Sequence, residues 1–251
     1  MDGADPDRWS AVASDWSHLW GDVARPAWRA VVTATGIGPG SRVLDVGCGS
    51  GELLAYLDRL GASPAGIDPA PGMVALARSR VAGADVRLGS FEHLPWLDGS
   101  FDVVTAFNAL QFADDTLDAL AECVRVVRPG GHVAVANWAE GERNDLNQIE
   151  AAVAEAAGEA PLPDGDLRQP GRLERLLAEA GLDVVAGGLV ELPWEVPDDD
   201  RLVRGVLMGE DPATMAAAAP TVLAAARPFR TATGGYRLHN AFRFAVGRAP
   251  A

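Results

Sequence analysis

Short apolar runs alternate with stretches of helical period along this chain. The first run, Val43 to Val46, is partly β-branched and suits a parallel strand covered on both faces, and a helical segment over 52–59 follows. Later elements are expected as strands at 64–68, 84–90, 101–108 and 132–138, with helices ending near Val81 and spanning 114–127. This strand–helix order predicts one α/β domain.

A glycine loop separates the first strand from its helix. Gly47, Gly49 and Gly51 leave alternate positions of the loop without a side chain, so a ligand can approach the backbone closely. The helix that begins near Glu52 directs its unpaired N–H groups and the positive end of its dipole toward the same crevice. Asp45, two residues before the loop, is placed to orient it and to accept a hydrogen bond from a cationic ligand. We therefore expect a nucleotide-like ligand at this loop.

The spacing of the glycines distinguishes two classes of ligand. A dinucleotide fingerprint has the form Gly-x-Gly-x-x-Gly, whereas in this chain the third glycine falls one residue early and Glu52 stands in its place. An NAD-type oxidoreductase is accordingly the weaker interpretation. The pattern Asp-x-Gly-x-Gly-x-Gly over 45–51 instead resembles motif I of the class I S-adenosylmethionine-dependent methyltransferases.

The resemblance extends well beyond the loop. Asp68 follows Gly47 by 21 residues, at the end of the second strand, and matches the family residue that binds the ribose hydroxyls. The stretches 91–104 and 120–131 also match, so the likeness is continuous over about 41–138 and resumes at 235–248. It implies S-adenosylmethionine as cofactor, S-adenosylhomocysteine as product, and cofactor contacts at Asp45, Gly47, Cys48, Gly49, Gly51, Asp68, Pro69, Met73, Ser90, Phe91, Glu92, Asn108 and Gln111.

One position departs from the family pattern. Ser90 stands where the family usually has an acidic residue for the adenine amino group. The adenine is then expected to contact the Ser90 hydroxyl, the backbone N–H of Phe91 or Glu92.

The same resemblance implies the fold. We expect an α/β, Rossmann-like, seven-stranded, mostly parallel sheet with an antiparallel last strand, helices on both faces and a helical cap at the ligand edge. The chain is expected to form a single methyltransferase domain, 1–251. Its expected parts are an N-terminal cap (1–35), a cofactor-binding core (36–139), substrate-lid insertions (140–170 and 194–234) and the last strand (235–249).

The segments outside the core are expected to shape the substrate pocket. Trp9, Trp16 and Trp20 share one helical face in the cap, which predicts a buried stripe, and Trp16 and Trp20 are also candidates for ligand contact. Because an antiparallel last strand begins at the ligand edge, its first residues are expected near the site. The candidate pocket residues are Trp16, Trp20, Gln111, Trp138, Tyr236 and His239.

Candidate catalytic residues follow from the same placement. His18 in the cap and His239 in the last strand are the candidate general bases, although a base is required only for a weakly acidic acceptor. Positioning of the acceptor and exclusion of water are the alternative. Cys48 has no neighbouring base in its motif and is not expected to be a nucleophile. Since His and Cys form no cluster with metal-ligand spacing, we expect no metal.

Composition narrows the class of partner. The net charge of −14 would repel a phosphate backbone, and no basic cluster offsets it, so nucleic acid and anionic membranes are poor partners. No run approaches about 18 apolar residues, and the N-terminus lacks a signal-peptide pattern, so a cytoplasmic protein is expected. Its expected oligomeric state is a monomer or a homodimer.

Together these features predict methyl transfer from S-adenosylmethionine to a small, partly apolar metabolite, with secondary metabolism as one setting. The alternatives are the oxidoreductase and a non-methylating or non-catalytic relative that binds the cofactor structurally.

Overall fold

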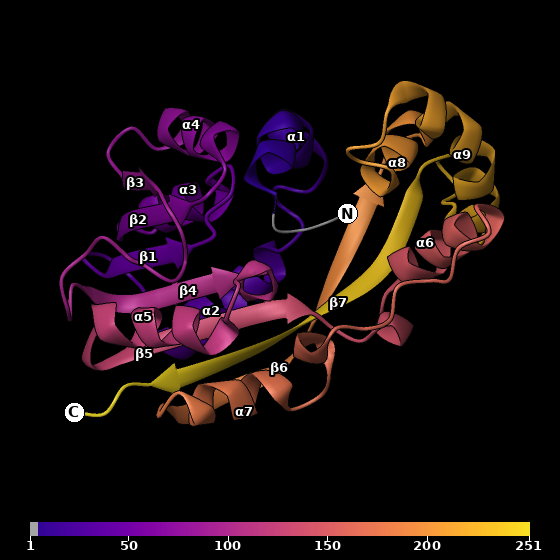
Figure 1. The fold of residues 1–251 in the computed structure, drawn as a ribbon. Helices are drawn as coiled ribbons and strands as arrows, with labels where there is room; N and C mark the ends of the chain where they lie inside the picture. Colours follow the sequence, from indigo (N-terminus) through magenta and orange to yellow (C-terminus); the bar gives the residue numbers. More distant parts are fainter. Residues whose placement is uncertain (1–4) are drawn as a thin grey trace.

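The computed structural model describes residues 5–251 as a mixed sheet with helices on both faces (Figure 1). The strands are β1 (Arg42–Val46), β2 (Ser63–Asp68), β3 (Asp85–Leu88), β4 (Phe101–Phe107), β5 (Val127–Trp138), β6 (Asp183–Val196) and β7 (Tyr236–Arg248). The α-helices are α1 (Pro6–Leu19), α2 (Arg25–Thr35), α3 (Glu52–Arg59), α4 (Pro71–Arg80), α5 (Thr116–Val126), α6 (Asp145–Ala156), α7 (Arg172–Glu179), α8 (Asp199–Val206) and α9 (Pro212–Ala225).

The strand order determines where a ligand can enter. The seven strands lie in the order β3-β2-β1-β4-β5-β7-β6. Strands β1 to β5 pair in parallel, whereas β7 is antiparallel to both of its neighbours, β5 and β6. The chain order reverses between β1 and β4, so a crevice forms at their carboxyl ends. The predicted α/β fold with an antiparallel last strand is confirmed.

Two layers of helix bury the sheet. Helices α5 and α7 cover one face, where Leu120 and Leu176 pack with Leu44 and Val104 of the strands. Helices α2 and α3 cover the other face, where Trp28 and Leu53 pack against Val43. The alternation of Val43 and Leu44 between the two faces is the period-2 pattern of a strand that is buried on both sides.

Strands β6 and β7 continue past the carboxyl edge of the parallel strands (Figure 1). Trp138, the last residue of β5, pairs with Phe242, whereas Tyr236 lies beyond the end of β5 and pairs with Val196 of β6 and with Arg230. The projecting ends carry α6, α8 and α9, and these pack with α1 into a separate apolar cluster that includes Trp194 and Leu202. One end of the crevice is therefore enclosed by helices.

The predicted elements differ from the structure in α5, in β5 and after α6. Helix α5 begins at Thr116 and not at 114, because the Asp115 carboxylate caps it by accepting hydrogen bonds from the N–H groups of Leu117 and Asp118. Strand β5 begins at Val127 and not at His132. No element was predicted for the segment that forms α7 and most of β6. A proline inside a helix removes an N–H donor, yet α9 continues through Pro220.

Among residues 5–251, no helix is long and apolar enough to cross a membrane.

Candidate active site

The glycine loop is held by the end of β2. The carbonyl oxygen of Ile67 accepts hydrogen bonds from the N–H groups of Gly47 and Cys48, at 2.9 and 3.0 Å. The Asp68 carboxylate accepts one from Gly49 N–H at 2.9 Å and one from Ala70 N–H at 2.9 Å. Asp68 is thus held against the loop, with oxygen lone pairs remaining for a ligand.

Each glycine of the loop is required for a different reason. All three have positive φ. A Cβ on Gly47 would lie 2.4 Å from Ala109 Cβ, whereas a Cβ on Gly49 would have only Trp16 Nε1 nearby, at 3.9 Å. A Cβ on Gly51 would lie 2.8 Å from the Cα of Ala77 on α4. Gly51 therefore permits helix packing and does not line the cavity, which differs from the ligand contact that we expected.

Two carboxylates and a thiol are buried at the loop. Burial raises the pKa of Asp45 to about 7; a hydrogen bond from Thr105 at 2.7 Å opposes this shift, and nearby Asp68 adds to it. Burial also raises the pKa of Asp68. Burial, followed by the charges of Asp68 and Asp45, holds the pKa of the Cys48 thiol well above its usual value, so this thiol is a poor nucleophile.

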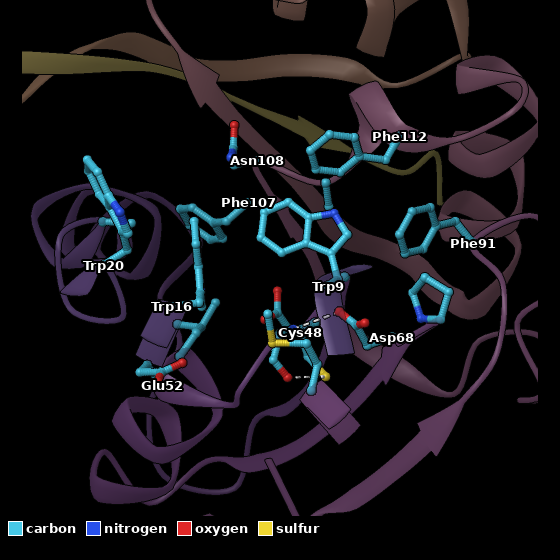
Figure 2. Close-up of a pocket in the computed structure, with 18 of the residues that line it drawn as sticks. Trp9, Trp16, Trp20, Cys48, Glu52, Asp68, Phe91, Phe107, Asn108 and Phe112 are labelled. Carbon is cyan, nitrogen blue, oxygen red and sulfur yellow. Dashed lines mark hydrogen bonds between the residues drawn. The ribbon is translucent and has the colours of Figure 1, made fainter. Parts of the chain in front are cut away.

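A cavity of about 300 Å³ opens in front of this loop (Figure 2). Its wall includes most of the predicted cofactor residues: Asp45, Gly47, Cys48, Gly49, Asp68, Pro69, Met73, Ser90, Phe91, Glu92 and Asn108. Figure 2 shows the Trp9 indole between Phe112 and Asp68, and neither Trp9 nor Phe112 was among the predicted site residues. The structure therefore gathers residues from the loop, the adjacent strands and α1 around one space.

A second cavity of about 800 Å³ lies beside the first and extends toward α6 and α8. Seven residues line both cavities, and we call them the junction: Trp9, Trp16, Trp20, Asn108, Phe112, Asp114 and Trp138. Gln111 lines the second cavity only. The predicted pocket residues Trp16, Trp20 and Trp138 thus lie where the two spaces meet.

The aromatic residues of the junction form a continuous series of ring contacts. Trp16 packs edge-on against Trp9, with ring centroids 5.3 Å apart, and stacks with Trp20 at 6.3 Å. Trp20 in turn contacts Trp138 at 6.1 Å and stacks on Trp194 at 4.0 Å. The spacing of the tryptophans in α1 therefore places one helical face toward both the lid helices and the cavities.

The end of β4 has an unusual backbone conformation. Asn108 has a φ of 50°, which Asn tolerates better than most residues. Its carbonyl oxygen and its Oδ1 atom both accept hydrogen bonds from Gln111 Nε2, each at 3.0 Å. Gln111 thereby orients Asn108 at the junction, although its own side chain faces the larger cavity.

Ser90, which we expected to face the adenine, is hydrogen-bonded to Glu92. The Ser90 hydroxyl donates a hydrogen bond to Glu92, whose other carboxylate oxygen accepts one from Asp114 N–H at 3.0 Å. Partial burial alone would raise the pKa of Glu92, but these hydrogen bonds hold it below its usual value. Glu92 therefore supplies an ionised carboxylate to the wall of the first cavity.

Glu52 has a role that the sequence pattern did not reveal. It is 9% exposed, lines the first cavity and accepts hydrogen bonds from Ser17 of α1 and Ser50 of the loop, at 2.8 and 2.9 Å. Arg80 of α4 forms an ion pair with the same carboxylate at 3.0 Å. A Cβ on Gly21 would lie 2.6 Å from the backbone carbonyl oxygen of Ser17 and 2.7 Å from Glu52 Oε1, so a glycine is needed where the end of α1 meets Glu52. Glu52 therefore joins the cap to the loop.

Besides Gly51, three predicted residues lie away from both cavities. His18 is exposed on α1, with its Nδ1 atom 2.7 Å from the Ser14 carbonyl oxygen, and His239 is exposed on β7. Tyr236 is buried and donates a hydrogen bond to Asp199 at 2.8 Å. The start of β7 lies on the expected side of the sheet, but His239 and Tyr236 precede Phe242 by three and six residues. These lengths of strand span about 10 and 20 Å, so both side chains lie past the site. Phe242 is the β7 residue that reaches the first cavity.

In the described part of the chain, no group of three or more His, Cys, Asp and Glu residues is arranged to hold a metal ion.

Comparison with known proteins identifies the family. A methyltransferase-domain family model matches residues 44–135. A ubiquinone biosynthesis O-methyltransferase of Xanthomonas campestris is 34% identical over 210 residues, covering 75% of this chain and 84% of that protein. An uncharacterized protein of Mycobacterium tuberculosis is 35% identical over 128 residues, covering 49% of this chain and 47% of that protein. The chain thus spans about half the length of some of the relatives that it matches.

Solved structures agree on the fold. The crystal structure of a proposed methyltransferase from Bacillus halodurans superposes with a TM-score of 0.62 at 14% identity, covering 89% of this chain and 99% of that one. The chain belongs to the class I S-adenosylmethionine-dependent methyltransferases, as its motifs predicted.

Proposed function

We propose that this protein transfers a methyl group from S-adenosylmethionine to a small, partly apolar molecule. The observation that carries the proposal is the pair of adjoining cavities, one lined by the glycine loop and Asp68 and the other largely by apolar side chains. When bound, the methyl donor supplies an electrophilic methyl group on a positively charged sulfur. The protein's own contribution is to bind both molecules, to align them at the junction and to exclude water.

The residues present suit the donor. Asp68 has free acceptor capacity for ribose hydroxyls, and the open space beside Gly49 admits a ligand close to the backbone. Asp45 is a buried carboxylate without an ion pair among residues 5–251, and an ammonium group of the donor would compensate its charge. Glu92 and Ser90 are the candidates for contact with the adenine amino group.

The remaining segments take the roles expected of a single domain over 1–251. The core 36–139 holds the donor, and 235–249 forms the last strand. The cap 1–35 covers the donor, whereas the insertions 140–170 and 194–234 enclose the acceptor as lids. Glu52, through Ser17, fixes the cap in place. Neither candidate histidine has geometric support as a base, so we favour positioning by the cap, Asn108 and Gln111.

Thermal unfolding tests the proposal. S-adenosylmethionine and S-adenosylhomocysteine should each raise the Tm of the protein, because a ligand that binds only the native state stabilises it by mass action. NAD and NADP, added at the same concentrations, should leave the Tm unchanged. A shift with NAD alone would establish the oxidoreductase alternative, and donor binding without methyl transfer to any acceptor would favour the non-methylating one.

A further inference from the structure

The second cavity can restrict the chemistry of the acceptor, if the proposed function holds. At about 800 Å³ it has the size of a site for a ring-bearing small molecule. Leu146, Leu176 and Met208 contribute to its apolar wall. The reacting end of the acceptor must reach the junction, because only there do the two cavities share their lining.

The junction offers aromatic faces to that reacting end. Trp9, Trp16 and Trp138 are partly exposed and line both cavities, and Phe112 lies 5.9 Å from Trp9 between ring centroids. Indole faces attract cations, and the attraction is strongest where the cation is shielded from water. A positively charged group is therefore favoured at the junction.

The basic residues of the second cavity are already paired. Arg168 forms an ion pair with Asp164 at 3.1 Å and donates hydrogen bonds to Ala139 and Asn147. Arg172 forms ion pairs with Asp166 and Glu179. An acceptor that carried a carboxylate or phosphate would have to displace these partners, so the wall gives an anion little net attraction.

Two acidic residues of the same wall form no ion pair within residues 5–251. Glu150 accepts one hydrogen bond, from Asn147 Nδ2 at 3.2 Å. Loss of hydration raises the pKa of its carboxyl and the charge of Arg168 opposes this rise, so a bound cation would favour the ionised form of Glu150 in the same way. Asp114, at the junction, likewise has no ion pair with any described residue. The electrostatic balance of the cavity therefore agrees with the aromatic faces, since both favour a cation.

The geometry points to an amine as the methyl acceptor: a ring-bearing molecule whose nitrogen reaches the junction tryptophans. The nitrogen reacts in its neutral form, and its lone pair forms the new N–C bond while the C–S bond breaks and its electron pair passes to sulfur. The sulfur becomes a neutral thioether, and the positive charge moves to nitrogen, facing the indoles. A secondary or tertiary product then loses a proton to water, whereas a tertiary acceptor yields a quaternary ammonium product.

Calorimetric titration of the full chain, saturated with S-adenosylhomocysteine, tests the inference. The probes are benzyltrimethylammonium, its uncharged isostere 2,2-dimethylpropylbenzene, and phenylacetate. We expect the cation to bind about 10-fold more tightly than the isostere, and phenylacetate to bind most weakly. Equal affinity for cation and isostere, or a preference for phenylacetate, overturns the inference. Failure of S-adenosylhomocysteine to bind would instead overturn the proposed function.

Two variants test which residues cause the preference for the cation over its uncharged isostere. Glu150→Gln should lower affinity for the cation by about 2- to 5-fold and leave affinity for the isostere unchanged. The matched control is Glu155→Gln, an exposed position on the same helix that lines neither cavity. Trp16→Leu should reduce the cation-to-isostere ratio toward one. If both Glu150→Gln and Trp16→Leu bind S-adenosylhomocysteine yet keep the wild-type ratio, the amine inference is wrong.

Discussion

Asp45→Asn should make the ligand-free protein more stable while weakening its binding of S-adenosylhomocysteine. The pKa of Asp45 is raised from 3.8 to about 7, which corresponds to about 4 kcal/mol of unfavourable free energy for the ionised carboxylate in the folded state. Asn removes that charge and can still accept the hydrogen bond from Thr105. Its new N–H₂ group needs a partner, so we expect a net gain in the free energy of unfolding of about 1–3 kcal/mol at pH 8.

The sign of this effect depends on pH. A carboxylic acid whose pKa is raised by folding contributes stability that is complete below the unfolded pKa and is lost as the pH rises through the folded value. The wild-type protein therefore loses this contribution between about pH 4 and 7. The gain from Asp45→Asn should be large at pH 8 and small at pH 5, as measured by urea unfolding of the ligand-free protein.

A surface carboxylate provides the control. Partial burial would raise the pKa of Asp102, but hydrogen bonds from the Arg42 backbone and from Arg128 hold it below its usual value. Asp102→Asn should therefore reduce stability slightly and leave S-adenosylhomocysteine affinity unchanged. Wild-type affinity should itself rise as the pH increases through about 7, because Asp45 must ionise to pair with the ligand's ammonium group. An Asp45→Asn protein that is less stable at pH 8 would contradict the buried-charge explanation.

Gly49→Val should abolish donor binding without preventing folding. The space beside Gly49 contains only Trp16 Nε1, at 3.9 Å from the position of a Cβ, so the isopropyl group would project into the first cavity. We expect S-adenosylhomocysteine affinity to fall by about 100-fold or more, equivalent to about 2.7 kcal/mol. Because φ at Gly49 is 51°, any side chain also costs about 1–2 kcal/mol in backbone strain.

A substitution at a second glycine distinguishes the effect of backbone strain from the effect of obstructing the first cavity. Gly158 has a φ of 76°, and a Cβ there would meet nothing within 4 Å. It lines neither cavity. Gly158→Val should thus lose a similar amount of stability in urea and keep wild-type affinity for S-adenosylhomocysteine. Normal affinity in a folded Gly49→Val protein would mean that the donor does not approach this loop.

The core of the fold could be predicted because its signals are local. Strand β1, the glycines and the start of α3 are encoded within 42–59, where apolar period and glycine spacing are sufficient. Asp68 follows from the same logic, since parallel strands bring their carboxyl ends to one edge. Strand β6 was harder to predict from the sequence. Gly187, Gly188 and Pro193 interrupt its pattern of apolar residues, and as an edge strand it leaves much of its surface exposed.

The site could be predicted only where sequence spacing determines which way a side chain points. Trp16 and Trp20 share a helical face with Trp9, and all three line the cavities. The prediction that His239 and Tyr236 lie at the site was wrong. The length of β7 that extends beyond the parallel strands depends on its pairing with β6, which no local pattern encodes. The role of Glu52 depends on contacts with Ser17 and Arg80, each about 30 residues away along the chain.

The most direct test is a calorimetric titration of S-adenosylhomocysteine into the wild-type protein and into Asp68→Ala. We expect the wild-type protein to bind one molecule per chain. Loss of a charged acceptor for two ribose hydroxyls should cost the variant about 1–3 kcal/mol, which is about a 5- to 150-fold weaker Kd. Equal affinity in the two proteins, with the variant folded, would remove Asp68 from the donor site and contradict the placement of the nucleoside in the first cavity.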